Sequence, residues 1–220
     1  MYRWIYEDAA SGGDLYKLLP RKHKKRKLQK KSVVEKVINK KSIHQLDAVV
    51  DTRSRIGDIE IDSIVSAGNK AGLVTATERK SRLLMACKVP SKDSIAARDA
   101  LCIMLKGRKV KTITSDNGSE FAMHEQISKT LGALYYFADP YSSYQRGSNE
   151  NGNGMIRRYY PKGIDFTVVA DTELQQNIYL INNLPRKIHG GKTAHEVYYG
   201  INKRLIKAKH RKQFIFAFRT

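Results

Sequence analysis

The sequence predicts an α/β fold in which a mixed five-stranded sheet is flanked by helices, with a basic arm in front of it. Two observations predict this fold. Three successive strand-like segments open the domain, and short strands then alternate with helices that carry apolar stripes. The length of 220 residues and a hydrophobic share of 41% suit one domain of moderate size with extensions.

The first strand-like segment carries three carboxylates at alternate positions. Successive side chains in a strand point to opposite faces, so Asp58, Glu60 and Asp62 share one face. These carboxylates repel one another, and a cation or a basic neighbour is needed to hold them. The segment is therefore a candidate site as well as a strand.

The expected elements follow one another along most of the chain, separated by turns rich in Gly, Asn and Asp. Ser91 or Asp93 is expected to cap one helix, and Asp171 or Thr172 a later one. The polar stretch 141–149 is expected to form a loop. Strands are expected over 56–65, 72–78, 83–89, 111–115 and 133–138, and helices over 1–19 (broken at 11–13), 93–106, 119–131, 150–160, 171–184 and 193–199.

This order of elements is that of the ribonuclease H-like fold. In that arrangement the first strand and the strand before Asp116 are neighbours at the centre of the sheet. Asp62 and Asp116 then face each other at one edge, and a helix beginning near Glu150 brings in a third carboxylate. Clustered carboxylates bind hard divalent cations such as Mg²⁺, and a pair of such ions suits an in-line phosphodiester displacement.

The charge balance indicates a polyanionic partner. Lys and Arg number 41 against 21 Asp and Glu, a formal net charge of +20, and phosphates are the usual counterpart of such an excess. No apolar run is long enough to span a membrane. Cys87 and Cys102 are expected to be buried free thiols in a reducing cytosol. A basic arm is expected to lie along a phosphate backbone, through Arg21, Lys22, Lys24, Lys25, Arg26 and Lys27.

Several blocks of the chain resemble successive motifs of the insertion-sequence-thirty family of bacterial transposases. The resemblance covers roughly residues 1–199, and its Arg-Gly-Ser-Asn-Glu-Asn and Tyr-Pro-Lys-Gly blocks are the most specific. The blocks are Gly57–Asp62, Thr77–Arg82, Ile113–Phe121, Asp139–Ser143, Arg146–Gly154, Arg157–Gly163 and Asn183–Lys187.

The resemblance implies a catalytic core of the DDE type, which cleaves and joins DNA strands at the ends of an insertion sequence. Matched residue by residue, the catalytic and metal-binding triad is Asp62, Asp116 and Glu150, with two Mg²⁺ ions and Mn²⁺ as the expected substitute. It also implies double-stranded DNA as the partner, at transposon ends and target, and a homo-oligomer on the chromosome in the bacterial cytoplasm. The expected DNA contacts outside the arm are Arg146, Arg157, Arg158 and Lys162.

The chain departs from the family pattern at several positions. Ile59 and Ile61 stand where the family usually has Trp and Gly, and Ala194 stands near the end where Pro is usual. The start of the chain resembles only the end of the family's amino-terminal helix-turn-helix region, so the reader of the transposon ends is expected to be missing. The expected parts are a helical remnant over 1–20, a basic linker over 21–50, the catalytic core over 51–200 and a basic, aromatic tail over 201–220.

Two other interpretations remain open at this stage. The chain fits a two-metal exonuclease through Asp58 and Glu60 and through a Tyr-x-x-x-Asp pattern from Tyr135 to Asp139, although that pattern belongs on a helix and here lies in an expected strand. The chain also fits a basic DNA-binding remnant without catalytic activity.

Overall fold

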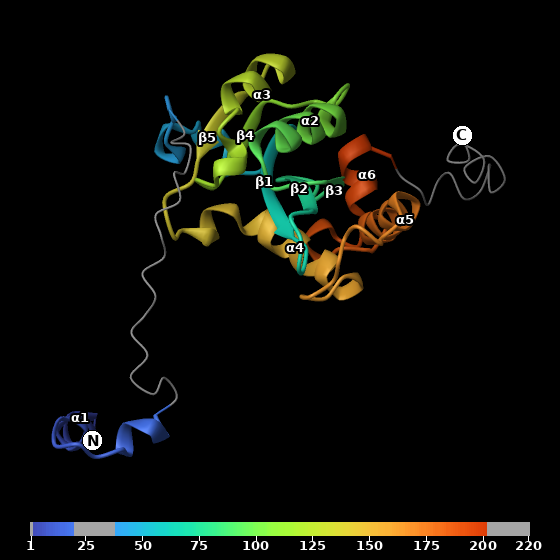
Figure 1. The fold of residues 1–220 in the computed structure, drawn as a ribbon. Helices are drawn as coiled ribbons and strands as arrows, with labels where there is room; N and C mark the ends of the chain where they lie inside the picture. Colours follow the sequence, from blue (N-terminus) through green and yellow to red (C-terminus); the bar gives the residue numbers. More distant parts are fainter. Residues whose placement is uncertain (1, 20–37, 202–220) are drawn as a thin grey trace. The chain divides into compact units, whose positions relative to one another are not determined.

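The computed structural model describes residues 2–19 and 38–201, which belong to two separate units divided at residue 34. The first unit contains the helix α1 (Tyr2–Ala10) and the short 3₁₀ turn η1 (Leu15–Leu18). The second unit contains the sheet and every other described element (Figure 1). The basic arm, Arg21 to Lys27, and the tail from position 202 lie outside the described residues, so the DNA contacts expected there stay predictions.

The second unit is built on a five-stranded mixed sheet, as the sequence predicted. Its strands lie in the order β3-β2-β1-β4-β5. β1 pairs antiparallel with β2 and parallel with β4, and β5 continues the parallel side. The carboxyl ends of β1 and β4 therefore point the same way, toward one edge of the sheet. The strands are β1 Asp58–Val65, β2 Gly72–Glu78, β3 Leu84–Val89, β4 Thr112–Ser115 and β5 Leu134–Phe137.

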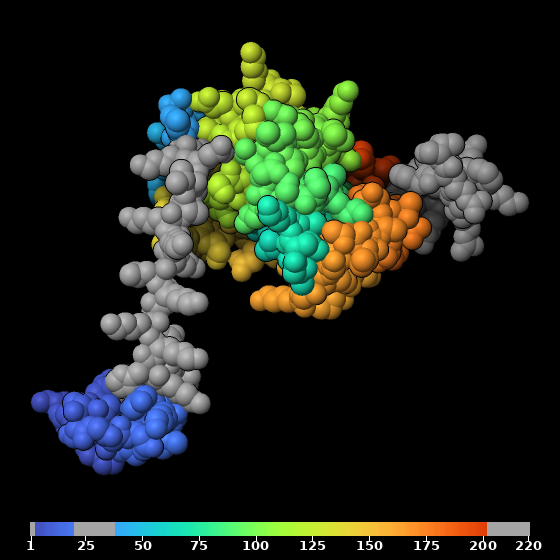
Figure 2. Space-filling model, viewed as in Figure 1, coloured from blue at the N-terminus to red at the C-terminus, as the bar shows by residue number. Residues whose placement is uncertain are grey.

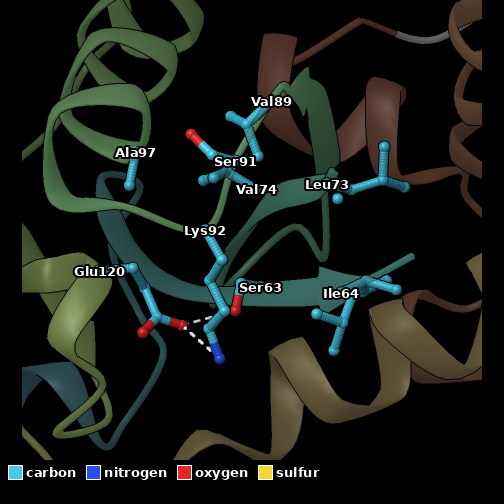
Figure 3. A pocket seen from close by; sticks show the side chains of 11 residues that line it. Ser63, Ile64, Leu73, Val74, Val89, Ser91, Lys92, Ala97 and Glu120 are labelled. Carbon is cyan, nitrogen blue, oxygen red and sulfur yellow. Dashed lines mark hydrogen bonds and ion pairs between the residues drawn. The ribbon is translucent and has the colours of Figure 1, made fainter. Parts of the chain in front are cut away.

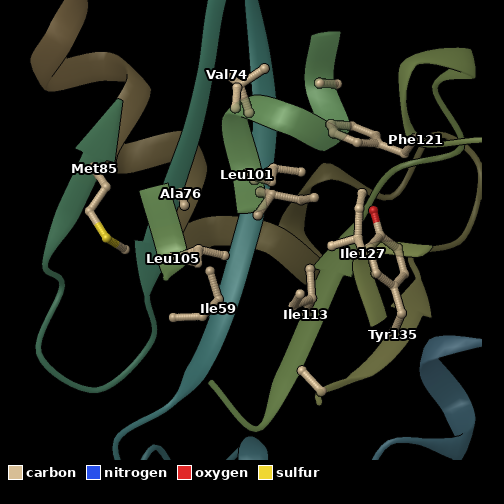
Figure 4. Close-up of a cluster of buried hydrophobic side chains, with 14 of the residues drawn as sticks. Ile59, Val74, Ala76, Met85, Leu101, Leu105, Ile113, Phe121, Ile127 and Tyr135 are labelled. Carbon is tan, nitrogen blue, oxygen red and sulfur yellow. The ribbon is translucent and has the colours of Figure 1, made fainter. Parts of the chain in front are cut away.

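Helices cover both faces of this sheet (Figure 1). The alternation along β1 divides its side chains: Ile59 and Ile61 enter one buried cluster with Leu101 of α2 (Figure 4), and Ile64 enters another with Ile156 of α4. The helices are α2 Ser94–Leu105, α3 His124–Leu131, α4 Gly147–Tyr159, α5 Asp171–Asn182 and α6 Ala194–Tyr199. The 3₁₀ turns are η2 Ile43–Gln45, η3 Ala48–Val50, η4 Ser119–Phe121, η5 Ser143–Arg146 and η6 Lys187–His189.

The helix α4 begins earlier than the sequence predicted. Residues 147–149 were expected to belong to a loop, yet they form the first turn of the helix. The backbone N–H of Asn149 donates to Oε2 of Glu60 at 2.9 Å, so a buried carboxylate on β1 satisfies a donor that a helix normally leaves without an internal partner. A contact from another element thus overrides the local preference of Asn and Gly for turns.

Other departures are smaller. The helix expected over 119–131 is divided into η4 and α3. Asp93 caps α2 as expected, by accepting from the N–H of Ala96. α5, in contrast, begins after Ala170 without a side-chain cap from Asp171 or Thr172. Cys87 and Cys102 are free but half-buried rather than buried.

Both edges of the sheet have their backbone groups engaged by other parts of the chain. On β3, the side chain of Asn182 accepts from the N–H of Leu84 at 2.8 Å and donates to its carbonyl at 2.7 Å. Gln175 donates to the carbonyl of Ala86. At the other edge, the N–H of Phe137 donates to the carbonyl of Lys41.

The helix α4 lies very close to β2 and β3 at Gly152. A Cβ atom there would come within 2.8 Å of Thr77 Oγ1 and 2.9 Å of Leu84 Cδ1, both buried, whereas a Cβ at Gly154 would meet nothing within 4 Å. We expect Gly152→Val to lower the free energy of unfolding by about 2–3 kcal/mol through overpacking. Gly154→Val, the matched control, should change it by less than about 0.5 kcal/mol. Urea denaturation of both variants measures the difference, and equal stabilities would contradict the close packing.

Candidate active site

Each of the three carboxylates on the polar face of β1 has an arginine beside it. The requirement for basic neighbours, inferred from their repulsion, is therefore met inside the chain. Two of the three carboxylates are fully buried, and the third, Asp62, is half-buried. The pairs are Asp58 with Arg55 at 3.0 Å, Glu60 with Arg79 at 3.3 Å and Asp62 with Arg146 at 3.6 Å.

Asp62 and Asp116 lie on the same guanidinium. Nη2 of Arg146 is 3.2 Å from Oδ2 of Asp116, and Nη1 is 3.6 Å from Oδ1 of Asp62. Nη1 also donates to the carbonyl of Ile61 at 3.0 Å. Asp116 directly follows β4, which is the neighbour of β1. The structure thus brings together the two aspartates that the sequence placed on adjacent strands.

The surroundings of Asp62 favour a positive charge. Burial raises the pKa of its carboxyl above the usual range, Arg146 and the N–H of Ser63 act in the opposite direction, and the nearby charge of Asp116 raises the pKa further. A carboxylate that lies beside a second negative charge is stabilised by a cation between the two. In this structure the guanidinium of Arg146 is that cation.

Two asparagines fix α4 against β1 and β2. Oδ1 of Asn149 accepts from Thr77 Oγ1 at 3.0 Å. Asn153 accepts from Thr75 Oγ1 at 2.8 Å and donates to Oδ2 of Asp62 at 3.1 Å. These contacts match a structural role for both asparagines, and they set the helix at a fixed rotation over the aspartates.

Glu150 lies in the first turn of α4. It precedes Asn153 by three residues, a spacing that puts helix side chains on one face, and Asn153 contacts Asp62. Its side chain is exposed, and within the described residues it makes no hydrogen bond or ion pair. Among residues 2–19 and 38–201, no three His, Cys, Asp or Glu side chains are arranged to hold one metal ion. The predicted triad is therefore not assembled in this structure.

A fourth carboxylate, Glu120, supports the two aspartates, and the sequence reasoning did not single it out. It is 3% exposed, accepts from Ser63 Oγ at 2.6 Å and pairs with Lys92 Nζ at 3.0 Å (Figure 3). The N–H of Ser63 donates to Oδ1 of Asp62 at 2.8 Å. A Cβ atom at Gly118 would be 2.4 Å from Oε2 of Glu120 and 3.0 Å from Oδ1 of Asp116. The sequence feature that could have indicated Glu120 as part of the site is its place in the Asp-Asn-Gly-Ser-Glu segment after β4.

The remaining predicted DNA contacts differ in their exposure. Arg158 and Lys162 are exposed at the end of α4 and just beyond it. Arg157 is half-buried and lies 3.5 Å and 3.3 Å from the carbonyls of Tyr160 and Pro161. Burial lowers the pKa of its guanidinium. Arg158 and Lys162 are thus the better placed of the three to meet a polyanion.

The tyrosine of the exonuclease pattern is inside the sheet. Tyr135 belongs to β5 and is 3% exposed, and burial raises the pKa of its hydroxyl strongly. Asp139 lies after the end of this strand, where its carboxylate forms hydrogen bonds with the side chains of Gln145 and His44. The helix that this pattern requires is absent from the described residues around Tyr135.

Comparison with curated proteins shows which sequences the chain resembles. It is 36% identical over 202 residues to a transposase for insertion sequence element IS4351 of Bacteroides fragilis, a match that covers 90% of this chain and 62% of the relative. It is 35% identical over 164 residues to the transposase InsI for element IS30A of Escherichia coli, covering 73% of this chain and 43% of the relative. The chain belongs to the IS30 type of transposase. No protein-family model matches it.

This IS30-type chain spans about two fifths to three fifths of the length of these relatives and shares its fold with solved integrase cores. The catalytic core domain of BIV integrase aligns over 69% of this chain and 98% of its own, with a TM-score of 0.53 and 21% identity. A simian T-cell lymphotropic virus intasome chain aligns over 64% of this chain and 54% of its own, with a TM-score of 0.53 and 20% identity. These likenesses confirm the ribonuclease H-like fold. No helix in the described ranges is long and apolar enough to cross a membrane.

Proposed function

We propose that this chain carries the catalytic core of a DNA transposase, which cleaves DNA strands at the ends of an insertion sequence and joins them to a target. The core corresponds to residues 51–200, with Asp62, Asp116 and Glu150 as its catalytic residues. The observation that carries the proposal is the meeting of Asp62 and Asp116 on one cation, at the edge where β1 and β4 end side by side.

The donor set of this site fits a divalent metal ion. Carboxylate oxygens are the ligands that Mg²⁺ prefers, and Asp62 and Asp116 already share one positive charge, that of Arg146. Asp62, Asp116 and Glu150 would hold two Mg²⁺ ions, with Mn²⁺ as a substitute. When bound, the ions would activate the attacking oxygen and stabilise the leaving one.

The protein's own residues position the proposed metal ligands. Ser63 and Asn153 each hold one oxygen of Asp62, which leaves the rotation of that carboxylate fixed. The buried pair of Asn149 with Glu60 fixes α4, and with it the place of Glu150. The chemistry needs no nucleophilic side chain, because water and a DNA 3′-hydroxyl supply the attacking oxygens.

Double-stranded DNA is the proposed partner, and the net charge of +20 would draw it to an acidic site that would otherwise repel phosphate. The exposed Arg158 and Lys162 lie on the same helix as Glu150 or just after it and would contact the backbone of the bound strand. Action as a homo-oligomer on DNA is part of the same proposal.

A nicking assay with a duplex that carries the insertion-sequence ends tests the proposal. We expect strand cleavage in Mg²⁺ or Mn²⁺, none after chelation with EDTA, and none from Asp116→Asn. Circular dichroism shows that the variant is folded, and a fluorescence anisotropy titration shows that it still binds DNA. Binding without cleavage by the unaltered chain would instead favour a non-catalytic DNA-binding protein.

A further inference from the structure

Arg146 occupies an unusual place for an arginine on a DNA-binding protein. Its side chain is only 12% exposed, and its guanidinium lies between Asp62 and Asp116. Nε of the same side chain is buried and has no hydrogen-bond partner among residues 2–19 and 38–201. A positive charge is therefore placed between two of the proposed metal ligands, and one nitrogen of the group that carries it lacks a hydrogen bond within the described residues.

We propose that Arg146 is a displaceable internal cation, which neutralises Asp62 and Asp116 in the metal-free protein and must leave them when a divalent metal binds. This inference rests on the proposed function, because it concerns the regulation of the same site. A guanidinium and a divalent ion would compete for the same two carboxylates, since the like charges repel at short range. Metal binding thus includes the cost of breaking the contacts of Arg146.

The position of Arg146 in the chain suits such a movement. It is the last residue of η5 and the residue before α4, with a non-helical backbone at φ −123° and ψ 36°. Gly147 follows, and a Cβ there would meet no atom within 4 Å. On the preceding side, Gln145 is bonded to both the N–H and the carboxylate of Asp139. Arg146 therefore lies between a fixed turn and a fixed helix, beside a glycine with open space at its Cβ position.

The same contacts explain why the triad is not assembled. Glu150 lies in the first turn of α4, four residues after Arg146, and the aspartates are already neutralised by the guanidinium. If a metal replaced that charge, Glu150, the one carboxylate in α4, would complete the ligand set. The released guanidinium would bind a nearby anion, and a phosphate of the proposed DNA partner is such an anion.

Titration with Mn²⁺ tests this inference without any reaction. We would measure Mn²⁺ affinity by isothermal titration calorimetry and by electron paramagnetic resonance, in the absence of DNA, for the unaltered chain, Arg146→Gln and Arg146→Lys. We expect Arg146→Gln to bind Mn²⁺ about tenfold more tightly, because the competing charge is gone. Arg146→Lys keeps a charge and should stay within about threefold of the unaltered chain. Lys129→Gln removes one exposed charge from α3 and should not change the affinity.

The direction of the effect separates this role from a structural one. If Arg146 only held the fold together, its removal would loosen the site and weaken metal binding. Unchanged or weaker Mn²⁺ binding by Arg146→Gln, or equal tightening by Lys129→Gln, would overturn the inference. The nicking assay remains a separate test. If the unaltered chain does not cleave DNA, the proposed function is rejected, whereas the comparison of Mn²⁺ affinities alone decides the role of Arg146.

Discussion

Replacing Glu60 by Gln should lower the free energy of unfolding by about 3 kcal/mol or more, since breaking a buried ion pair leaves its partner charge uncompensated. Glu60 has no exposed surface, and Arg79 beside it is 6% exposed. The only other carboxylate paired with Arg79 among the described residues is the exposed Asp51. Oε2 of Glu60 also accepts the N–H of Asn149 at the start of α4, so one substitution weakens both the sheet and its attachment to the helix.

Urea denaturation followed by circular dichroism measures this loss. We expect the midpoint to fall while the slope against urea stays the same, because the surface exposed on unfolding is unchanged. Glu150→Gln provides the matched control, since it makes the same chemical change at an exposed position. A Glu60→Gln variant as stable as that control would show that the buried pair contributes little.

The second large effect is expected from Glu150→Gln, the substitution used above as the stability control, and it concerns the rate of nicking. Glu150→Gln should reduce Mg²⁺-dependent nicking by about a thousandfold, because the loss of one metal interaction costs several kcal/mol of transition-state stabilisation. Its free energy of unfolding should change by less than about 0.5 kcal/mol, because the side chain is exposed and makes no hydrogen bond or ion pair within the described structure.

Nicking rates under single-turnover conditions measure this effect, together with DNA affinity to show that binding persists. A two-metal exonuclease built on Asp58 and Glu60 would keep its activity after this substitution. Retained activity in Glu150→Gln would therefore remove Glu150 from the proposed triad and reopen that interpretation.

The sequence predicted the frame of the molecule better than the interior of the site. Alternation along β1 and the order of strands and helices were enough to place Asp62 and Asp116 on neighbouring strands, and the structure puts both on one guanidinium. Such patterns are local, and they follow from the periods of strands and helices. The expected strands differ from the observed ones by one or two residues at their ends.

The contacts that define the site were not predictable in the same way. Arg146 was expected to bind DNA, and Glu120 was not expected to have a role, because nothing local shows that either meets Asp62 or its neighbours. The early start of α4 has the same origin, since Glu60 lies far from Asn149 in the sequence and reaches it only in the fold. Long-range hydrogen bonds and ion pairs to carboxylates decide these details, and no period in the sequence reports them.

The hydrogen bonds from α5 to the edge strand β3 affect how copies of the molecule meet at high local concentration. An uncovered edge strand offers its peptide groups to any similar strand that comes near. Asn182 already occupies the N–H and the carbonyl of Leu84, and Gln175 occupies the carbonyl of Ala86. A second copy that approaches this edge therefore meets backbone groups that are already bonded, which disfavours edge-to-edge aggregation at high local concentration.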